Sequence, residues 1–198
     1  MSSLATLIQN GADATQLEAH LDALSAPQRI EETRALSPKL QRALWSRCEG
    51  RAPTLDQIVP VGSGAGVQVR HFGRNTLPVF KLFEKRFCEL PEGERGPERV
   101  LWGYNEGPTR AIVGPGYFVC RIAEPGAPGA VVIDYEQLPS HAPEGWPTLK
   151  PNERGLSRFV YAYMQDYLRR VSEHVTIGRA YRYGKESPNY FTLCRSDD

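Results

Sequence analysis

The most regular spacing of apolar residues lies near the C-terminal end of the chain. Apolar side chains recur every three or four positions, at Leu156, Phe159, Val160, Tyr163, Met164, Tyr167, Leu168, Val171 and Val175. This spacing places them on one side of an α-helix. Gly155 precedes the segment, and Arg169, Arg170 and His174 lie near its end, where basic groups interact favourably with a helix dipole. The pattern predicts a long amphipathic helix over residues 155–174.

The middle of the chain has a different residue pattern, in which glycine and proline separate short runs of strand-forming residues. The runs that predict strands are 67–72, 100–104, 111–113, 116–122, 131–135, 176–183 and 190–194. Residues 105–108 and 125–129 are turn sequences, and such short connections favour antiparallel neighbours. The segment from Val79 to Leu90 predicts a short helix, because Val79, Phe80, Phe83 and Phe87 follow helical spacing. Residues 138–154 are rich in proline and polar residues and predict a surface loop.

The first fifty residues carry helix start signals. Asp13 is followed by Gln16 in the manner of a capping box, and Ser25 and Ser37 each precede a proline in a predicted first helical turn. Gly50-Arg51-Ala52-Pro53 interrupts the helical pattern. We therefore expect an N-terminal helical appendage over 1–50 and a main domain over 51–198. The expected fold class is α+β: a curved antiparallel sheet or partial barrel packed on one long C-terminal helix, with a small N-terminal helical region.

Composition limits the classes of function. The chain has 198 residues, of which 40% are hydrophobic, and 24 basic against 23 acidic residues give a net charge of +1. This balance does not favour nucleic-acid binding over the whole surface. No apolar run approaches the ~20 residues that cross a bilayer, and the N-terminus MSSLATLIQN lacks the pattern of a secretory signal. We expect a cytoplasmic protein with no membrane partner, in which Cys48, Cys88, Cys120 and Cys194 stay reduced and buried.

Motifs for known chemistry are incomplete in this sequence. Gly62-Ser63-Gly64-Ala65-Gly66 is followed by Val67 where a dinucleotide-binding loop needs glycine, so a flexible turn is favoured. The four histidines lack the spacing that presents two metal ligands on one helix face, and no GxSxG sequence is present. The sequence therefore predicts no metal site and leaves any cofactor unidentified.

Aromatic residues with polar tips cluster in the predicted sheet. The candidate ligand-binding residues are Trp102, Tyr104, Asn105, Arg110, Tyr117, Arg121 and Tyr135, joined by Tyr163 and Tyr167 of the expected helix. A pocket with aromatic walls between the sheet and helix 155–174 would bring them together. The alternative interpretation, which the sequence does not exclude, is a sheet whose tyrosines and arginines lie on its solvated face.

Three functions remain open on this evidence. The first is a small-molecule-binding domain for an apolar or aromatic ligand. The second is a cofactor-independent enzyme of lyase, isomerase or hydrolase type in the same pocket, with His71 or Asp134 as general base and Arg110 or Tyr117 stabilising an oxyanion. The third is a protein-interaction module, in which the N-terminal helices bind a partner or a second copy to form a homodimer.

Overall fold

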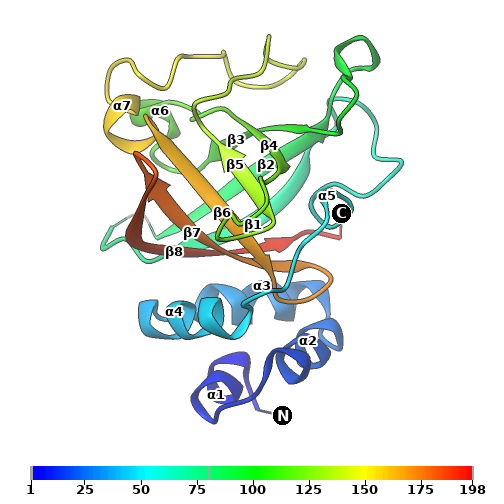
Figure 1. Ribbon diagram of the computed structural model, residues 1–198, viewed down its shortest axis with the longest axis vertical. Helices are drawn as coiled ribbons and strands as arrows, with labels where there is room; N and C mark the ends of the chain where they lie inside the picture. Colours follow the sequence, from blue (N-terminus) through cyan, green and yellow to red (C-terminus); the bar gives the residue numbers. More distant parts are fainter. Residues whose placement is uncertain (1, 80, 198) are drawn as a thin grey trace.

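The computed structural model describes residues 2–79 and 81–197. Within them the chain forms a closed antiparallel barrel, in which each strand pairs with the next along the sequence and β1 pairs with β8 (Figure 1). The strands are β1 (Val69–Asn75), β2 (Leu82–Glu89), β3 (Leu101–Glu106), β4 (Phe118–Ile122), β5 (Val131–Asp134), β6 (Met164–Arg170), β7 (Val175–Arg182) and β8 (Lys185–Arg195). Closure leaves no unpaired sheet edge in this part of the chain.

The barrel interior holds aromatic and aliphatic side chains that point inward at alternate strand positions. Phe87, Phe118 and Phe191 belong to this interior cluster. Strand glycines make room for two of these rings: a Cβ at Gly103 would overlap the ring of Phe118, and one at Gly178 would overlap the ring of Phe191. Small and large residues therefore alternate across neighbouring strands, which lets rings fill a small barrel.

Four helices form a layer against the outside of the barrel (Figure 1). They are α1 (Leu4–Gln9), α2 (Ala14–Asp22), α3 (Ala26–Ala35) and α4 (Pro38–Arg47). The predicted starts are confirmed: Asp13 and Gln16 form a reciprocal capping box, and the Ser37 side chain caps α4. This layer shares a buried core with the outer face of β7 and β8. Whether residues 1–50 separate as a unit stays a prediction.

The two ends of the barrel differ. The short helix α5 (Leu55–Ile58) packs into one end, where Leu55 and Ile58 join the interior cluster. The short helices α6 (Arg110–Val113) and α7 (Ser157–Val160) lie at the opposite end (Figure 1). A single turn of 3-10 helix, η1 (Glu92–Glu94), lies between β2 and β3. The cavity described below opens at the α6 and α7 end.

The predicted helix over 155–174 is wrong, and with it the expected fold class. That segment contains only the one-turn helix α7 and then strand β6, so no long C-terminal helix packs on a sheet. The backbone of Tyr163 has a φ of 59°, in the left-handed region, which ends any helix that starts at α7. The sheet itself is antiparallel, as expected, but it closes completely instead of curving around a helix.

Two shorter predictions are also wrong. Residues 82–89 form β2 instead of a helix, and Phe80, on which the helical spacing depended, lies outside the described residues. Residues 111–113 belong to α6 instead of a strand. The other predicted strands overlap the observed ones, with boundaries that differ by up to five residues. All four cysteines are buried.

Candidate functional site

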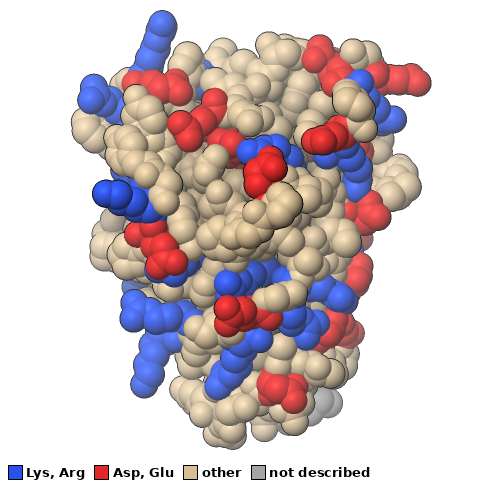
Figure 2. Space-filling model, viewed as in Figure 1, with Lys and Arg blue, Asp and Glu red and all other residues tan. Residues whose placement is uncertain are grey.

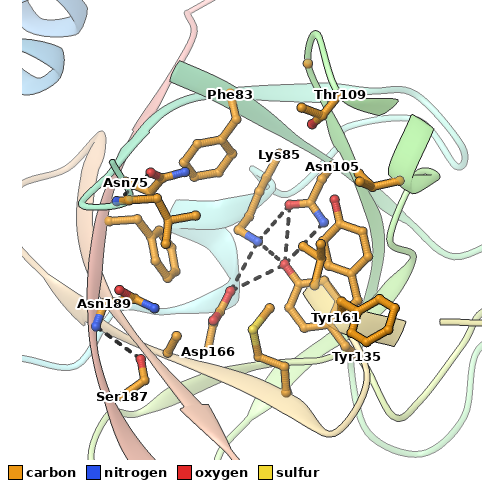
Figure 3. Close-up of a pocket in the computed structure, with 18 of the residues that line it drawn as sticks. Asn75, Phe83, Lys85, Asn105, Thr109, Tyr135, Tyr161, Asp166, Ser187 and Asn189 are labelled. Atoms are coloured by element: carbon orange, nitrogen blue, oxygen red, sulfur yellow. Dashed lines mark hydrogen bonds and ion pairs between the residues drawn. The ribbon is translucent and has the colours of Figure 1, made fainter. Parts of the chain in front are cut away.

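A cavity of about 470 Å³ opens at the α6 and α7 end of the barrel. Its walls are largely apolar and include Phe83, Val113, Tyr161, Met164 and Phe191. Figure 3 shows these walls around a small group of polar side chains at the base. The volume falls within the range of ~300–1,000 Å³ that is typical of small-molecule sites.

Four residues form the polar base of the cavity, three from strands and one from the position after β5: Lys85, Asn105, Asp166 and Tyr135 (Figure 3). Lys85 of β2 lies directly opposite Asn105 of β3 in the strand register. Its ammonium group donates to Asn105 Oδ1 at 3.0 Å, to Asp166 Oδ2 at 3.2 Å and to the Tyr135 hydroxyl. The base is therefore one connected network, in which inward positions of β2, β3 and β6 meet the residue that follows β5.

Burial governs the electrostatics of this network. The Lys85 and Asp166 side chains are 3% and 5% exposed. Burial lowers the pKa of Lys85, and the carboxylate of Asp166 partly offsets that effect. Burial likewise raises the pKa of Asp166, opposed by Lys85, and raises the pKa of Tyr135 well above its usual value. The pair is neutral overall, which is the arrangement that an apolar interior tolerates.

Tyr161 completes the wall next to the base. Its ring stacks on that of Tyr135, with centroids 5.4 Å apart and planes inclined by 15°. A Cβ at Gly116 would overlap the Tyr161 ring, and the φ of 53° at this position also favours glycine. The Gly116 carbonyl accepts a hydrogen bond from Asn105 Nδ2 at 2.9 Å. Gly116 thus fixes both the amide orientation at the base and the position of the aromatic wall.

The rim of the cavity is apolar and exposed. Leu77 and Val79 border it from the β1–β2 connection and Leu82 from the start of β2. Phe159 and Val160 border it from α7. All five are exposed to solvent, and Phe159 is the most exposed at 67%. Monomeric proteins seldom gather large apolar side chains on the surface without a binding role.

Three of the residues predicted from sequence line this cavity. Asn105 and Tyr135 belong to the base, and Arg110 lies at the mouth, where its Nε donates to Glu106 Oε1 at 2.7 Å. The structure therefore brings together residues from β3, from α6 and from the position after β5, and the wall that faces them is not a helix.

Three other predicted residues lie on the outer face of the barrel. Trp102, Tyr104 and Tyr117 pack under the loop between β5 and α7, against Trp146. The Tyr104 and Trp146 rings have centroids 4.8 Å apart, and the Tyr117 hydroxyl donates to the Pro147 carbonyl at 2.5 Å. These aromatics hold the loop on the barrel and do not line the cavity.

The remaining predicted residues are distributed over the molecule. Asp134 points outward and pairs with Arg121 at 3.4 Å. Tyr163 stacks on Tyr183 near the mouth, and the Tyr167 hydroxyl donates to Gln165 on the outer face. None of these residues lines the cavity.

His71 lies inside the barrel but at the α5 end, away from the cavity. Its Nε2 donates to the Ile58 carbonyl at 2.8 Å, and its ring packs against Phe87. Burial lowers the pKa of His71 to about 3. In this position the imidazole is neutral and fastens α5 to the barrel.

Sequence analysis missed Lys85, Tyr161 and Asp166. Lys85 is flanked at two-residue spacing by Phe83 and Phe87, and Asp166 lies between Met164 and Leu168 in the same way. A charged residue within an inward-facing, two-residue alternation was the available signal. It was hidden because both segments also match a helical spacing.

Figure 2 shows acidic and basic side chains interspersed over one face of the molecule, without a continuous basic surface on that face. In the described part of the chain, no helix is long and apolar enough to span a bilayer. No three His, Cys, Asp or Glu side chains among residues 2–79 and 81–197 lie close enough to hold a metal ion together.

Comparison with protein-family models, curated proteins and solved structures gave no match. A functional assignment therefore depends on the geometry of the site itself.

Proposed function

We propose that this barrel binds a small, largely apolar molecule in the cavity at the α6 and α7 end. One observation carries the proposal: a 470 Å³ cavity with apolar walls ends on a compact polar base and opens to the surface. Such a site buries an apolar body by the hydrophobic effect and orients it through a few polar contacts. The sequence features predict the same class of ligand, but with different cavity walls.

The rim supports the same proposal. Leu77, Val79 and Phe159 are exposed around the mouth, so a ligand that extends past the base would cover them. Covering apolar surface is favourable by about 25 cal/mol per Å². In the free protein, the mouth of the cavity therefore exposes apolar surface, which a bound apolar molecule would remove from water.

The test uses N-phenyl-1-naphthylamine, a neutral apolar dye that fluoresces when it leaves water. Ala180 lines the cavity from β7, so Ala180→Phe should fill the space and weaken dye binding at least about tenfold. Met164→Trp blocks the cavity independently from β6. Ala19→Phe makes the same exchange on the exposed side of α2 and should bind the dye as the wild type does. Folded Ala180→Phe and Met164→Trp proteins with wild-type dye affinity would refute the proposal.

A second candidate is an enzyme that performs proton transfer in the same cavity. The contact between Lys85, whose pKa burial lowers, and the Tyr135 hydroxyl is the observation that favours it. A lysine of lowered pKa is a general base, and a neighbouring hydroxyl stabilises a developing enolate. Incorporation of solvent deuterium next to the carbonyl of an apolar ketone, followed by NMR, tests this function. Exchange that is equal in wild type and Lys85→Met would exclude it.

Several expectations from the sequence stay predictions. They are a cytoplasmic location, the absence of a membrane partner, the absence of a nucleic-acid partner and a homodimer. The interaction-module hypothesis also remains open, since α1 to α4 bury a shared core against the barrel and still expose their outer side chains.

A further inference from the structure

The hydrogen bonds already formed at the base of the cavity limit which polar group a ligand can place there. An ammonium group has three N–H donors. The three donors of Lys85 have three protein acceptors: Asn105 Oδ1, Asp166 Oδ2 and the Tyr135 hydroxyl. Lys85 therefore has no donor left for a ligand while the network is intact.

The other donors at the base are also occupied. Asn105 Nδ2 donates to the Gly116 carbonyl at 2.9 Å and to the Tyr135 hydroxyl at 3.2 Å. The single Tyr135 hydroxyl proton has two acceptors within reach, Asn105 Oδ1 at 3.3 Å and Asp166 Oδ2 at 3.4 Å. The network thus offers a ligand no hydrogen-bond donor.

One acceptor remains. The interactions of Asp166 with Lys85 and Tyr135 all involve Oδ2, and Figure 3 shows both dashed lines ending on the same carboxylate oxygen. Asp166 Oδ1 makes no hydrogen bond to any residue that the structure describes, although Asp166 is a buried residue that lines the cavity. A carboxylate oxygen that faces the cavity without a protein partner is available to accept a hydrogen bond from a water molecule or a ligand.

We infer that the ligand is an apolar alcohol, whose hydroxyl group donates to Asp166 Oδ1. This inference rests on the proposed ligand-binding function. A carboxylate at the same place would bring a second negative charge against Asp166, and Lys85, Asn105 and Tyr135 would have no free donor for its oxygens. An ammonium group would lie against the Lys85 cation. A neutral hydroxyl satisfies the free oxygen and avoids both repulsions.

The experiment compares three molecules of equal chain length as competitors of N-phenyl-1-naphthylamine: dodecan-1-ol, its methyl ether and dodecanoic acid, at pH 8. The alcohol should bind at least about tenfold more tightly than either of the other two molecules. The ether lacks the donor, and the acid is ionised at this pH. An acid or an ether that binds as tightly as the alcohol would overturn the inference about the alcohol. In that case, binding of the dye would still support the proposed ligand-binding function. A wild-type protein that binds neither the dye nor any competitor overturns both.

A charge-neutralising variant provides the second measurement. Asp166→Asn leaves Lys85 without its carboxylate, so the acid should now bind more tightly than the alcohol. Glu124→Gln removes an exposed carboxylate between β4 and β5 and should keep the wild-type order. A folded Asp166→Asn protein that keeps the wild-type order contradicts the inference. If this variant does not fold, the comparison of alcohol, ether and acid on the wild type decides alone.

Discussion

Lys85 Nζ lies 3.2 Å from Asp166 Oδ2 inside the barrel, although the two residues are on strands β2 and β6, which are not neighbours in the sheet. The pair spans the barrel interior, and Phe83, Phe118 and Phe191 have ring centroids 5.1–5.7 Å from the ammonium nitrogen. Removal of either partner would leave the other as a buried charge without a counter-charge, which destabilises the folded protein.

The first prediction follows from that pairing. Lys85→Met should lower the free energy of unfolding by about 3–5 kcal/mol at pH 7, because it leaves Asp166 as a buried charge without a partner. The double variant Lys85→Met/Asp166→Leu should recover most of that loss. Urea denaturation measures both. Breaking the more exposed pair at the mouth by Arg110→Met should cost within about 1 kcal/mol. A double variant that is no more stable than Lys85→Met would contradict this account.

The second prediction concerns pH. Burial lowers the pKa of His71 to about 3 in the folded protein, from a usual value of 6.5. The unfolded chain therefore binds a proton that the folded protein does not, and stability falls as the pH drops from about 6.5 to about 3. The contribution of His71 is about 1.4 kcal/mol per pH unit within that window.

His71→Gln isolates this contribution, because glutamine keeps an N–H donor for the Ile58 carbonyl and does not titrate. Its free energy of unfolding should depend less steeply on pH between 6 and 4 than that of the wild type. NMR of the folded wild type provides a direct check, since the His71 ring resonances should not titrate above pH 4. Equal slopes for the two proteins would refute the assignment.

The third prediction distinguishes strand β6 from the helix that the sequence pattern predicts. Leu168 is fully buried in the barrel interior, so Leu168→Ala should cost about 2–5 kcal/mol. Phe159 is 67% exposed at the rim, so Phe159→Ala should change stability by less than about 1 kcal/mol. An amphipathic helix over 155–174 would require similar losses for both. Thermal unfolding compares them, and equal large losses would favour the helix.

The fourth prediction tests the packing that lets rings fill the barrel. A Cβ at Gly103 would overlap the Phe118 ring, so Gly103→Ala should destabilise the fold by about 1–3 kcal/mol. The double variant Gly103→Ala/Phe118→Leu should be less destabilised than the sum of its single changes. Gly93 has open space around its Cα, so Gly93→Ala should be nearly neutral in the same denaturant titration. A neutral Gly103→Ala would mean that the ring of Phe118 lies elsewhere.

The sequence correctly predicted those structural elements that depend on interactions between residues close together in the chain. The starts of α2 and α4 follow from Asp13 with Gln16 and from Ser37 with Pro38, because capping groups act within one turn. Glycine and proline likewise marked the turns that separate most strands, since these residues set the backbone angles of their own positions. Asn105 and Tyr135 were among the predicted pocket residues because amide and aromatic groups in and next to predicted strands were interpreted as a pocket lining, and both line the cavity.

The sequence by itself determined the capped N-terminal helices, the turn positions, the antiparallel pairing of short strands and part of the cavity base. Only the tertiary structure decided the identity of β6 and the rest of the base. β6 is covered on both faces, with Leu168 in the barrel and Tyr167 against the helical layer, so apolar residues occupy both faces and also match a helical spacing. Lys85 and Asp166 are 81 residues apart. Their pairing depends on barrel closure, and closure is a property of the whole set of strands, which no local pattern encodes.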